Sequence, residues 1–340
     1  MNRALIIQTA FLGDVILTTP LVQVLKREHP EMAVDIVVIP STREVVENHP
    51  AVSKVITYDK HGAQKSPWSF ISLGRELRKM KYDVIICPHR SLRSALLSRM
   101  TNAPVRIGFR NSALPGSFTS TLAWKFGVHE VDRNLSLLEP LGIATHREVP
   151  RLFPTQGNRE EVDLFIGENR IEKPFAAIAP GTVWRTKQYP VAKMVEVAKQ
   201  LLERFARIVI VGGPADAETA ASFDGIDSRI VSAVGKLSVM SSAELISRAS
   251  LLVSNDSAPV HIAASFEVPT VAIFGPTAGN FGFYPYGDNS AVVETTGLGC
   301  RPCTIHGGAR CPIGTFDCME MITPYYVAAT ALRISGTRNG

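Results

Sequence analysis

The chain has 340 residues, of which 45% are hydrophobic and 20% are charged, and its net charge is +5. This length suits two domains that each bury a core, and the composition excludes a disordered or fibrous protein. No stretch approaches the roughly 20 apolar residues of a spanning helix, and the apolar run after Asn2 and Arg3 is too short for a secretory signal, so we expect a cytoplasmic protein.

The positive charge is concentrated in the first half of the chain. Residues 1–150 carry 19 basic and 13 acidic residues, whereas residues 151–340 carry 17 and 18. Residues 51–100 alone hold 10 basic and 3 acidic groups, without aromatic residues interleaved in the way that stacks nucleic-acid bases. We therefore expect an anionic small molecule or an anionic membrane surface as partner, and no nucleic acid.

Short β-branched runs alternate with helical stretches along the first half, which predicts a parallel sheet with right-handed crossovers. The strands are expected at residues 4–8, 34–39 and 83–87, and the helices at 20–30 and 72–83. The same alternation restarts near residue 175, with strands expected within 175–181, 207–213, 251–256 and 269–275 and helices at 191–205, 241–250 and 261–266. The sequence thus predicts two doubly wound α/β units in tandem.

The boundary between the units is predicted from residues 148–160, which are rich in Pro and polar residues and lack periodicity, as in a linker. Beyond residue 287 the regular pattern fails, until residues 324–334 predict a closing helix with Pro at its start. We therefore expect domains at 1–155 and 160–320, followed by a closing helical segment at 321–340.

The stretch Phe11–Pro20, "FLGDVILTTP", places Gly13 and Asp14 at the carboxyl end of the first predicted strand. Ligands of open α/β sheets bind at such ends, although Asp before a helix is also a good cap, and periodicity alone favours the capping role. Gly13 is the only glycine in this stretch, so the dinucleotide fingerprint G-x-G-x-x-G is missing. A dehydrogenase is therefore disfavoured.

The second unit supplies the loop "IAPGTVWRTKQYP", residues 178–190. Its Gly181, Thr182 and Lys187 follow a strand, so backbone N–H groups, a hydroxyl and an ammonium could surround a phosphate. The alternative is a polar loop with a solvated lysine.

A further buried strand ends in Asn255, Asp256 and Ser257, just before a helix that carries His261. This position also predicts a ligand site, with capping by Asp256 or Ser257 as the alternative, and His261 is expected to be structural or supporting.

Five segments together resemble a known family in order and spacing: "GDVILTTPLVQVLK", "APGTVWRTKQYP", "GGPADAE", "SNDSAPVHIAAS" and "IFGPT". The family is that of the ADP-heptose:lipopolysaccharide heptosyltransferases of glycosyltransferase family 9, and the similarity is greatest to the heptosyltransferase II group. The resemblance implies a GT-B fold, in which two Rossmann-like domains face each other across a cleft, the first binding the acceptor and the second the nucleotide sugar. It also implies inverting transfer of L-glycero-D-manno-heptose from ADP-heptose to the anionic, lipid-anchored inner core of lipopolysaccharide. The expected step is the addition of the second heptose. The resemblance further implies a peripheral protein at the cytoplasmic face of the inner membrane.

The resemblance also implies roles for single residues. Asp14 matches the general base on the acceptor hydroxyl, and a carboxylate suits this task because it must take a proton while ADP leaves. Donor-binding residues implied in the same way are Gly181, Thr182, Lys187, Asp256 and Ser257, with Asp216 or Glu218 at the ribose. Acceptor-binding residues are Gly13, Arg90 and Arg93, the two arginines being three apart on one predicted helix.

The chain departs from the family pattern at two places. Ala258 stands where the family commonly has Gly, and Gln188 and Tyr189 follow Lys187 where many members have Arg and Trp. Two other functions stay open: the same scaffold acting on another sugar acceptor or a protein, and a non-catalytic nucleotide-sugar-binding protein, which would not need Asp14.

Four of the five cysteines form the spacing C-x2-C-x7-C-x6-C at Cys300, Cys303, Cys311 and Cys318. In a cytosolic protein this spacing suggests a structural zinc site, with free or redox-active thiols as the alternative. No cofactor is expected to be required for the reaction.

Overall fold

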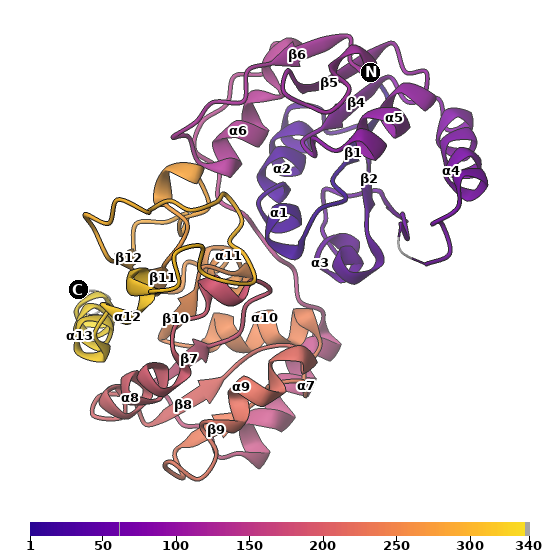
Figure 1. Ribbon diagram of the computed structural model, residues 1–340. Coiled ribbons are helices and arrows are strands. Elements are labelled where there is room, and N and C mark those ends of the chain that lie inside the picture. Colours follow the sequence, from indigo (N-terminus) through magenta and orange to yellow (C-terminus); the bar gives the residue numbers. More distant parts are fainter. Residues whose placement is uncertain (61, 337–340) are drawn as a thin grey trace. The chain divides into compact units, whose positions relative to one another are not determined.

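The computed structural model describes residues 1–60 and 62–336. The chain divides into two compact units, Met1–Phe153 and Pro154–Gly340. Each unit contains one six-stranded sheet with helices packed around it (Figure 1). Among the described residues, no helix is both long enough and apolar enough to cross a membrane.

The first unit has the strand order β3-β2-β1-β4-β5-β6, and all neighbouring strands are parallel. Its strands are β1 (Arg3–Ile7), β2 (Ala33–Val38), β3 (Lys54–Thr57), β4 (Val84–Cys87), β5 (Val105–Phe109) and β6 (Ser120–Leu122). Its α-helices are α1 (Leu12–Ile16), α2 (Thr19–Glu28), α3 (Arg43–Glu47), α4 (Pro67–Lys79), α5 (Leu92–Met100) and α6 (Glu130–Ser136). Short 3-10 turns lie at η1 (Pro40–Thr42), η2 (Pro115–Ser117) and η3 (Glu139–Leu141).

The second unit has the order β12-β11-β10-β7-β8-β9, again parallel throughout. Its strands are β7 (Phe175–Ala179), β8 (Arg207–Ile210), β9 (Ile230–Ser232), β10 (Leu251–Asn255), β11 (Thr270–Phe274) and β12 (Ser290–Glu294). Its α-helices are α7 (Gln156–Glu168), α8 (Val191–Leu201), α9 (Ala217–Ala221), α10 (Val239–Arg248), α11 (Ala258–Ala264), α12 (Asp317–Glu320) and α13 (Pro324–Ser335). The 3-10 turns are η4 (Arg185–Lys187), η5 (Pro214–Asp216) and η6 (Gly279–Phe281).

Both sheets reverse their strand order at the corresponding place. The first strand of each unit lies in the middle, with β1 between β2 and β4 and β7 between β8 and β10. In the register, Ile6 lies opposite Ile86 and Ile178 opposite Val253. Crossovers leave in opposite directions from such a pair of strands, so a crevice opens beyond their carboxyl ends, where ligands of doubly wound folds bind.

Two features of the sequence interpretation are wrong. Residues 156–160, assigned to the linker, form the start of α7, where the Thr155 hydroxyl accepts the Asn158 N–H at 3.2 Å and the Asn158 side chain accepts the Thr155 N–H at 2.8 Å. The regular pattern does not stop at residue 287, because β12 pairs with β11. This edge strand is mostly half-buried, so it carries little of the apolar signal that marks the central strands.

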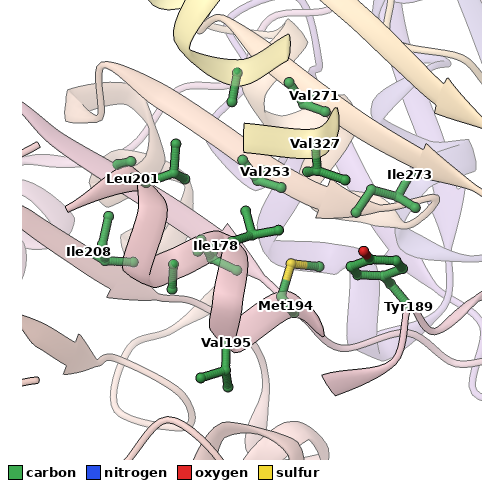
Figure 2. Packing of buried hydrophobic residues seen from close by; sticks show 14 of the residues in the cluster. Ile178, Tyr189, Met194, Val195, Leu201, Ile208, Val253, Val271, Ile273 and Val327 are labelled. Carbon is green, nitrogen blue, oxygen red and sulfur yellow. The ribbon is translucent and has the colours of Figure 1, made fainter. Parts of the chain in front are cut away.

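The core of the second unit is formed by strands together with α8 and α13 (Figure 2). Ile178 and Val253 of the sheet pack with Met194 and Leu201 of α8, and Val327 brings in α13; all five are fully buried. The predicted closing segment contains α13, whose apolar face belongs to the core of this unit, while its residues 337–340 lie outside the described residues.

Truncation of this core should lower stability strongly. Leu201→Ala removes fully buried methyl groups and should cost about 2 to 5 kcal/mol in the free energy of unfolding. Leu164→Ala on α7, where the side chain is 68% exposed, serves as the matched control and should cost less than about 0.5 kcal/mol. Urea unfolding followed by circular dichroism measures both; equal midpoints for the two variants would contradict this packing.

Candidate functional site

Asp14 lies in the first turn of α1, just after β1. One of its carboxylate oxygens accepts the backbone N–H of Phe11 at 3.2 Å, so Asp14 caps α1 from the third position of the helix, whereas the N-cap residue, the role considered for Asp14 from the sequence, is Phe11. Asp14 also lies close enough to Arg90 to act on its charge: burial lowers the pKa of Arg90, and the carboxylates of Glu130 and Asp14 oppose this effect. The structure therefore brings together two of the predicted residues, which follow β1 and β4.

Arg90 is stacked on an aromatic ring. Its guanidinium lies 4.7 Å from the centroid of Trp124, and the guanidinium of Arg133 lies 4.1 Å from that of the same ring. Arg133 is buried and pairs with Glu130 at 2.7 Å. The planar guanidinium of Arg90 is thus oriented by cation–π contact. Trp124 is not marked in the sequence, because it lies far along the chain from Arg90, in an irregular segment.

Further cationic groups lie at the carboxyl edge of the first sheet. The Lys60 ammonium donates to the carbonyl of Thr9 at 2.9 Å, and burial followed by the charge of Arg93 lowers its pKa. Arg93, exposed on α5, donates to the Tyr58 hydroxyl at 3.1 Å and to the Lys60 carbonyl at 3.3 Å. The sequence does not mark Lys60 either, since the short strand that it follows, β3, is not among the strands expected from the sequence. This edge can bind an anion.

In the second unit, Gly181 is packed against the Asp216 carboxylate. A Cβ at residue 181 would lie 2.0 Å from an oxygen of Asp216, so only glycine fits there. Asp216 accepts the N–H of Gly213 at 2.9 Å, and burial raises its pKa. Glu218, in contrast, is exposed in the first turn of α9. Of the two acids left open by the sequence, Asp216 is therefore the one that lies against the loop.

Lys187 and Asp256 form an ion pair at 2.7 Å, with 13% and 5% of their side chains exposed. The same carboxylate oxygen of Asp256 accepts the Thr277 hydroxyl at 2.7 Å. Ser257 makes no side-chain cap on α11, and its hydroxyl instead donates to the carbonyl of Asn255 at 3.3 Å. The ammonium group of Lys187 is thus held at the carboxyl end of β10, where the capping alternative for Ser257 is not realised.

The buried amide of Asn255 joins both ends of the loop that carries these groups. Its NH2 donates to the carbonyl of Pro180 at 2.7 Å, and its oxygen accepts the N–H of Tyr189 at 3.0 Å. The Thr182 hydroxyl accepts the N–H of Trp184 at 3.4 Å within the loop. The sequence marks Asn255 only as the end of a strand, since its bridging role depends on where the folded loop places Pro180 and Tyr189.

The four clustered cysteines do not form a zinc site among the described residues, where no group of three or more His, Cys, Asp or Glu side chains could hold a metal ion. All are free thiols. Burial raises the pKa of Cys303, and it raises that of Cys318 to about 11, whereas hydrogen bonds from backbone N–H groups, that of Phe316 first, lower the pKa of Cys311. Cys303, Cys311 and Cys318 instead line a small pocket with Thr186.

His261 is buried in α11, and its Nδ1 has no hydrogen-bond partner among the residues that the structure describes. Burial, followed by the charge of Lys187, lowers its pKa to about 3, so the imidazole is neutral near pH 7. This agrees with a structural rather than an acid–base role.

The stability of the second unit should therefore decrease in acid. Between the ordinary pKa of about 6.5 and the folded value of about 3, the unfolded chain binds a proton at His261 that the folded chain does not. The unfolding free energy then falls as the pH is lowered through this window, by about 2 kcal/mol at pH 5. In His261→Gln, the unfolding temperature should depend less steeply on pH between 7 and 5 than in the wild type; an unchanged slope would contradict the assignment.

Comparison with known proteins identifies related sequences over most of the chain. Residues 70–308 match glycosyltransferase family 9 (heptosyltransferase). Lipopolysaccharide heptosyltransferase 1 of Pseudomonas aeruginosa is 30% identical over 317 residues, which cover 88% of this chain and 86% of that protein. Lipopolysaccharide heptosyltransferase 3 of Escherichia coli is 30% identical over 283 residues, covering 78% and 82%.

Solved structures show the same fold. The glycosyltransferase family 9 protein from Veillonella parvula matches with a TM-score of 0.88 at 23% identity, over 99% of this chain and 98% of that one. ADP-heptose lipopolysaccharide heptosyltransferase II of E. coli matches with a TM-score of 0.80 at 21% identity over the whole of both chains. The E. coli heptosyltransferase WaaC, solved with ADP, gives 0.70 at 22% identity over 85% and 92%.

These matches confirm the predicted GT-B fold class with its two Rossmann-like units and parallel sheets. They also confirm the resemblance that the five sequence segments carry. The chain therefore belongs to glycosyltransferase family 9, the heptosyltransferase family, and is a glycosyltransferase.

Proposed function

We propose that this protein is an inverting transferase that moves L-glycero-D-manno-heptose from ADP-heptose to the inner core of lipopolysaccharide. The observation that carries this proposal is the fixed ammonium group of Lys187 at the carboxyl ends of β7 and β10, in a chain of the heptosyltransferase family. The related E. coli heptosyltransferase WaaC was solved with ADP. An adenine nucleotide diphosphate is therefore the donor group that we assign to the second unit.

The loop of residues 180–189 supplies the groups that a diphosphate needs. In our proposal the Gly181 backbone, the Thr182 hydroxyl and Lys187 surround the two phosphates, and the ammonium offsets the charge that develops on ADP as it leaves. Asp216, next to Gly181, accepts hydroxyls of the ribose. Asp256 and Ser257 directly follow β10, and we assign them to the donor sugar; Asp256 also holds Lys187 in place.

The first unit supplies the groups for the acceptor. We assign Asp14 as the base that takes the proton of the acceptor hydroxyl while that oxygen attacks the anomeric carbon on the face opposite to ADP, which inverts the configuration. Gly13, Arg90 and Arg93 bind the acceptor, with the guanidinium groups directed to its carboxylates and phosphates. Since this acceptor is anchored in lipid, we propose peripheral association of the basic unit with the cytoplasmic face of the inner membrane.

We further propose that the acceptor already carries one heptose and that this protein adds the second. The proposal rests on the motif similarity to the heptosyltransferase II group and on the full-length match to the solved E. coli heptosyltransferase II. Relatives named heptosyltransferase 1 and 3 match in sequence as well. Incubating the protein with ADP-heptose and with cores that carry no, one or two heptoses tests the step; product from the one-heptose core alone supports it, and product only from another core overturns it.

Replacement of the proposed base should abolish transfer and spare donor binding. Asp14→Asn keeps the size of the side chain but cannot accept the proton, so the transfer rate should fall at least about a hundredfold, while the affinity for ADP stays within about twofold. Glu76→Gln, on the exposed face of α4, is the control for loss of one negative charge in this unit. Measurement of kcat with ADP-heptose and a lipopolysaccharide core decides the matter: an Asp14→Asn rate near that of the wild type would remove Asp14 from catalysis.

Loss of the Lys187 ammonium should weaken binding of the donor nucleotide. Lys187→Ala removes a charge-assisted contact to the diphosphate, and the dissociation constant of ADP should rise roughly 10- to 100-fold. Lys199→Ala removes an exposed lysine of α8 and should have little effect. Calorimetric titration with ADP, UDP and GDP provides the measurement; selective binding of ADP supports the donor, and a preference for UDP or GDP overturns it.

A further inference from the structure

The cysteine-rich segment, residues 300–318, is bound directly to the turn that carries Lys187. The Thr186 N–H and hydroxyl both donate to the carbonyl of Gly308 at 3.0 Å, and the Gly308 N–H lies 2.7 Å from the same hydroxyl. Thr186 is only 5% exposed. Residues 122 positions apart are therefore joined by a reciprocal, partly buried set of hydrogen bonds, one position before Lys187.

The neighbouring residue Gly307 touches the side chain of Lys187 itself. Its φ of +87° is a conformation that other residues rarely adopt. A Cβ at this position would lie 3.0 Å from the Cβ of Trp184 and 3.1 Å from the Cγ of Lys187. The backbone at residue 307 thus packs against the stem of Lys187, and even a methyl group would push against that stem.

The same segment is fixed at its other end by Arg301, whose side chain is 9% exposed. Arg301 donates to the Thr277 carbonyl at 2.7 Å and pairs with Glu294 at 2.5 Å. The Thr277 hydroxyl in turn donates to Asp256, the partner of Lys187. The segment therefore packs directly against Lys187 through Gly307, and it is linked to Asp256 indirectly, through Thr277, whose carbonyl accepts from Arg301.

We propose that the cysteine-rich segment is part of the donor site, as a clamp that orients Lys187 for the diphosphate, and that Thr186 and Gly307 are its positioning residues. The inference rests on the proposed function of Lys187. A lysine side chain is long and flexible, and its ordering opposes binding. Because the clamp fixes both the backbone before Lys187 and the stem of its side chain, much of this ordering is complete before a nucleotide arrives.

The test compares variants of the full chain by calorimetric titration with ADP and by thermal unfolding. Thr186→Val leaves the N–H of Gly308 without its partner and should raise the dissociation constant of ADP about tenfold, whereas Thr186→Ser keeps the hydroxyl and should stay within about twofold of the wild type. Gly307→Ala should also raise the constant about tenfold. Its matched control is Gly314→Ala in the same segment, where φ is +81° but no atom lies within 4 Å of the added Cβ.

A double-mutant cycle with Lys187→Ala separates positioning from a general loss of stability. If Thr186 acts through Lys187, Thr186→Val should weaken ADP binding in the wild-type background and have no further effect when Lys187 is Ala. A weakening of equal size in both backgrounds would overturn the proposal, as would unchanged ADP affinity in both Thr186→Val and Gly307→Ala.

The same experiment distinguishes this inference from the proposed function. If Lys187→Ala binds ADP as the wild type does, the donor role of Lys187 is wrong and the clamp has no role in donor binding. If Lys187→Ala weakens binding but the Thr186 and Gly307 variants do not, the donor site stands and the clamp alone is wrong.

Discussion

The reversal of strand order next to the first strand of each sheet is the constraint on which both candidate sites depend. In the second unit the register places Ala179 of β7 opposite Ser254 of β10, so the chain leaves these strands at Pro180 and Asn255 side by side. This proximity allows the Asn255 amide to bind the carbonyl of Pro180 and, across the loop, the N–H of Tyr189. A buried amide must find such partners, and here they fix the loop that carries Gly181 and Lys187.

The Lys187–Asp256 ion pair is better explained by the orientation that it gives the Lys187 ammonium than by a contribution to the stability of the fold. Moving two charges out of water costs free energy that their attraction repays only in part, so a largely buried pair is weak support for a stable fold. The free-energy cost of burying this pair is reduced because the Thr277 hydroxyl also donates a hydrogen bond to the Asp256 carboxylate. What the arrangement achieves is a single position for an ammonium group, and a site that offsets charge on a leaving nucleotide needs a group that is already in place.

The sequence marks the site residues that follow strands. It does not mark those whose role depends on contacts with residues distant in the sequence. Gly13, Asp14, Gly181 and Asp256 all stand directly after or close behind apolar strand patterns, and parallel strands end at one edge of a sheet. Trp124 and Thr186 carry no such mark, because their roles depend on packing against Arg90 and Gly308. The cysteine spacing suggested a metal, yet the contacts of that segment with the loop run through backbone groups of Gly307 and Gly308, which no pattern of side-chain types predicts. Edge strand β12 is not predicted from the sequence, because its half-buried residues lack a strong apolar signal.

The two units hold their cations by different means, and the difference suits the two kinds of anion that we propose as their ligands. Lys187 is held by a carboxylate, which keeps its compact charge at one position at the carboxyl end of β10. Arg90 is held by the face of Trp124, and a cation–π contact uses the flat side of the guanidinium rather than its N–H donors. In the part of the chain that the structure describes, no side-chain hydrogen bond of Arg90 competes for those donors. In our proposal the N–H donors of the Arg90 guanidinium bind carboxylates and phosphates of the core glycan, whereas the Lys187 ammonium offsets the charge of the diphosphate.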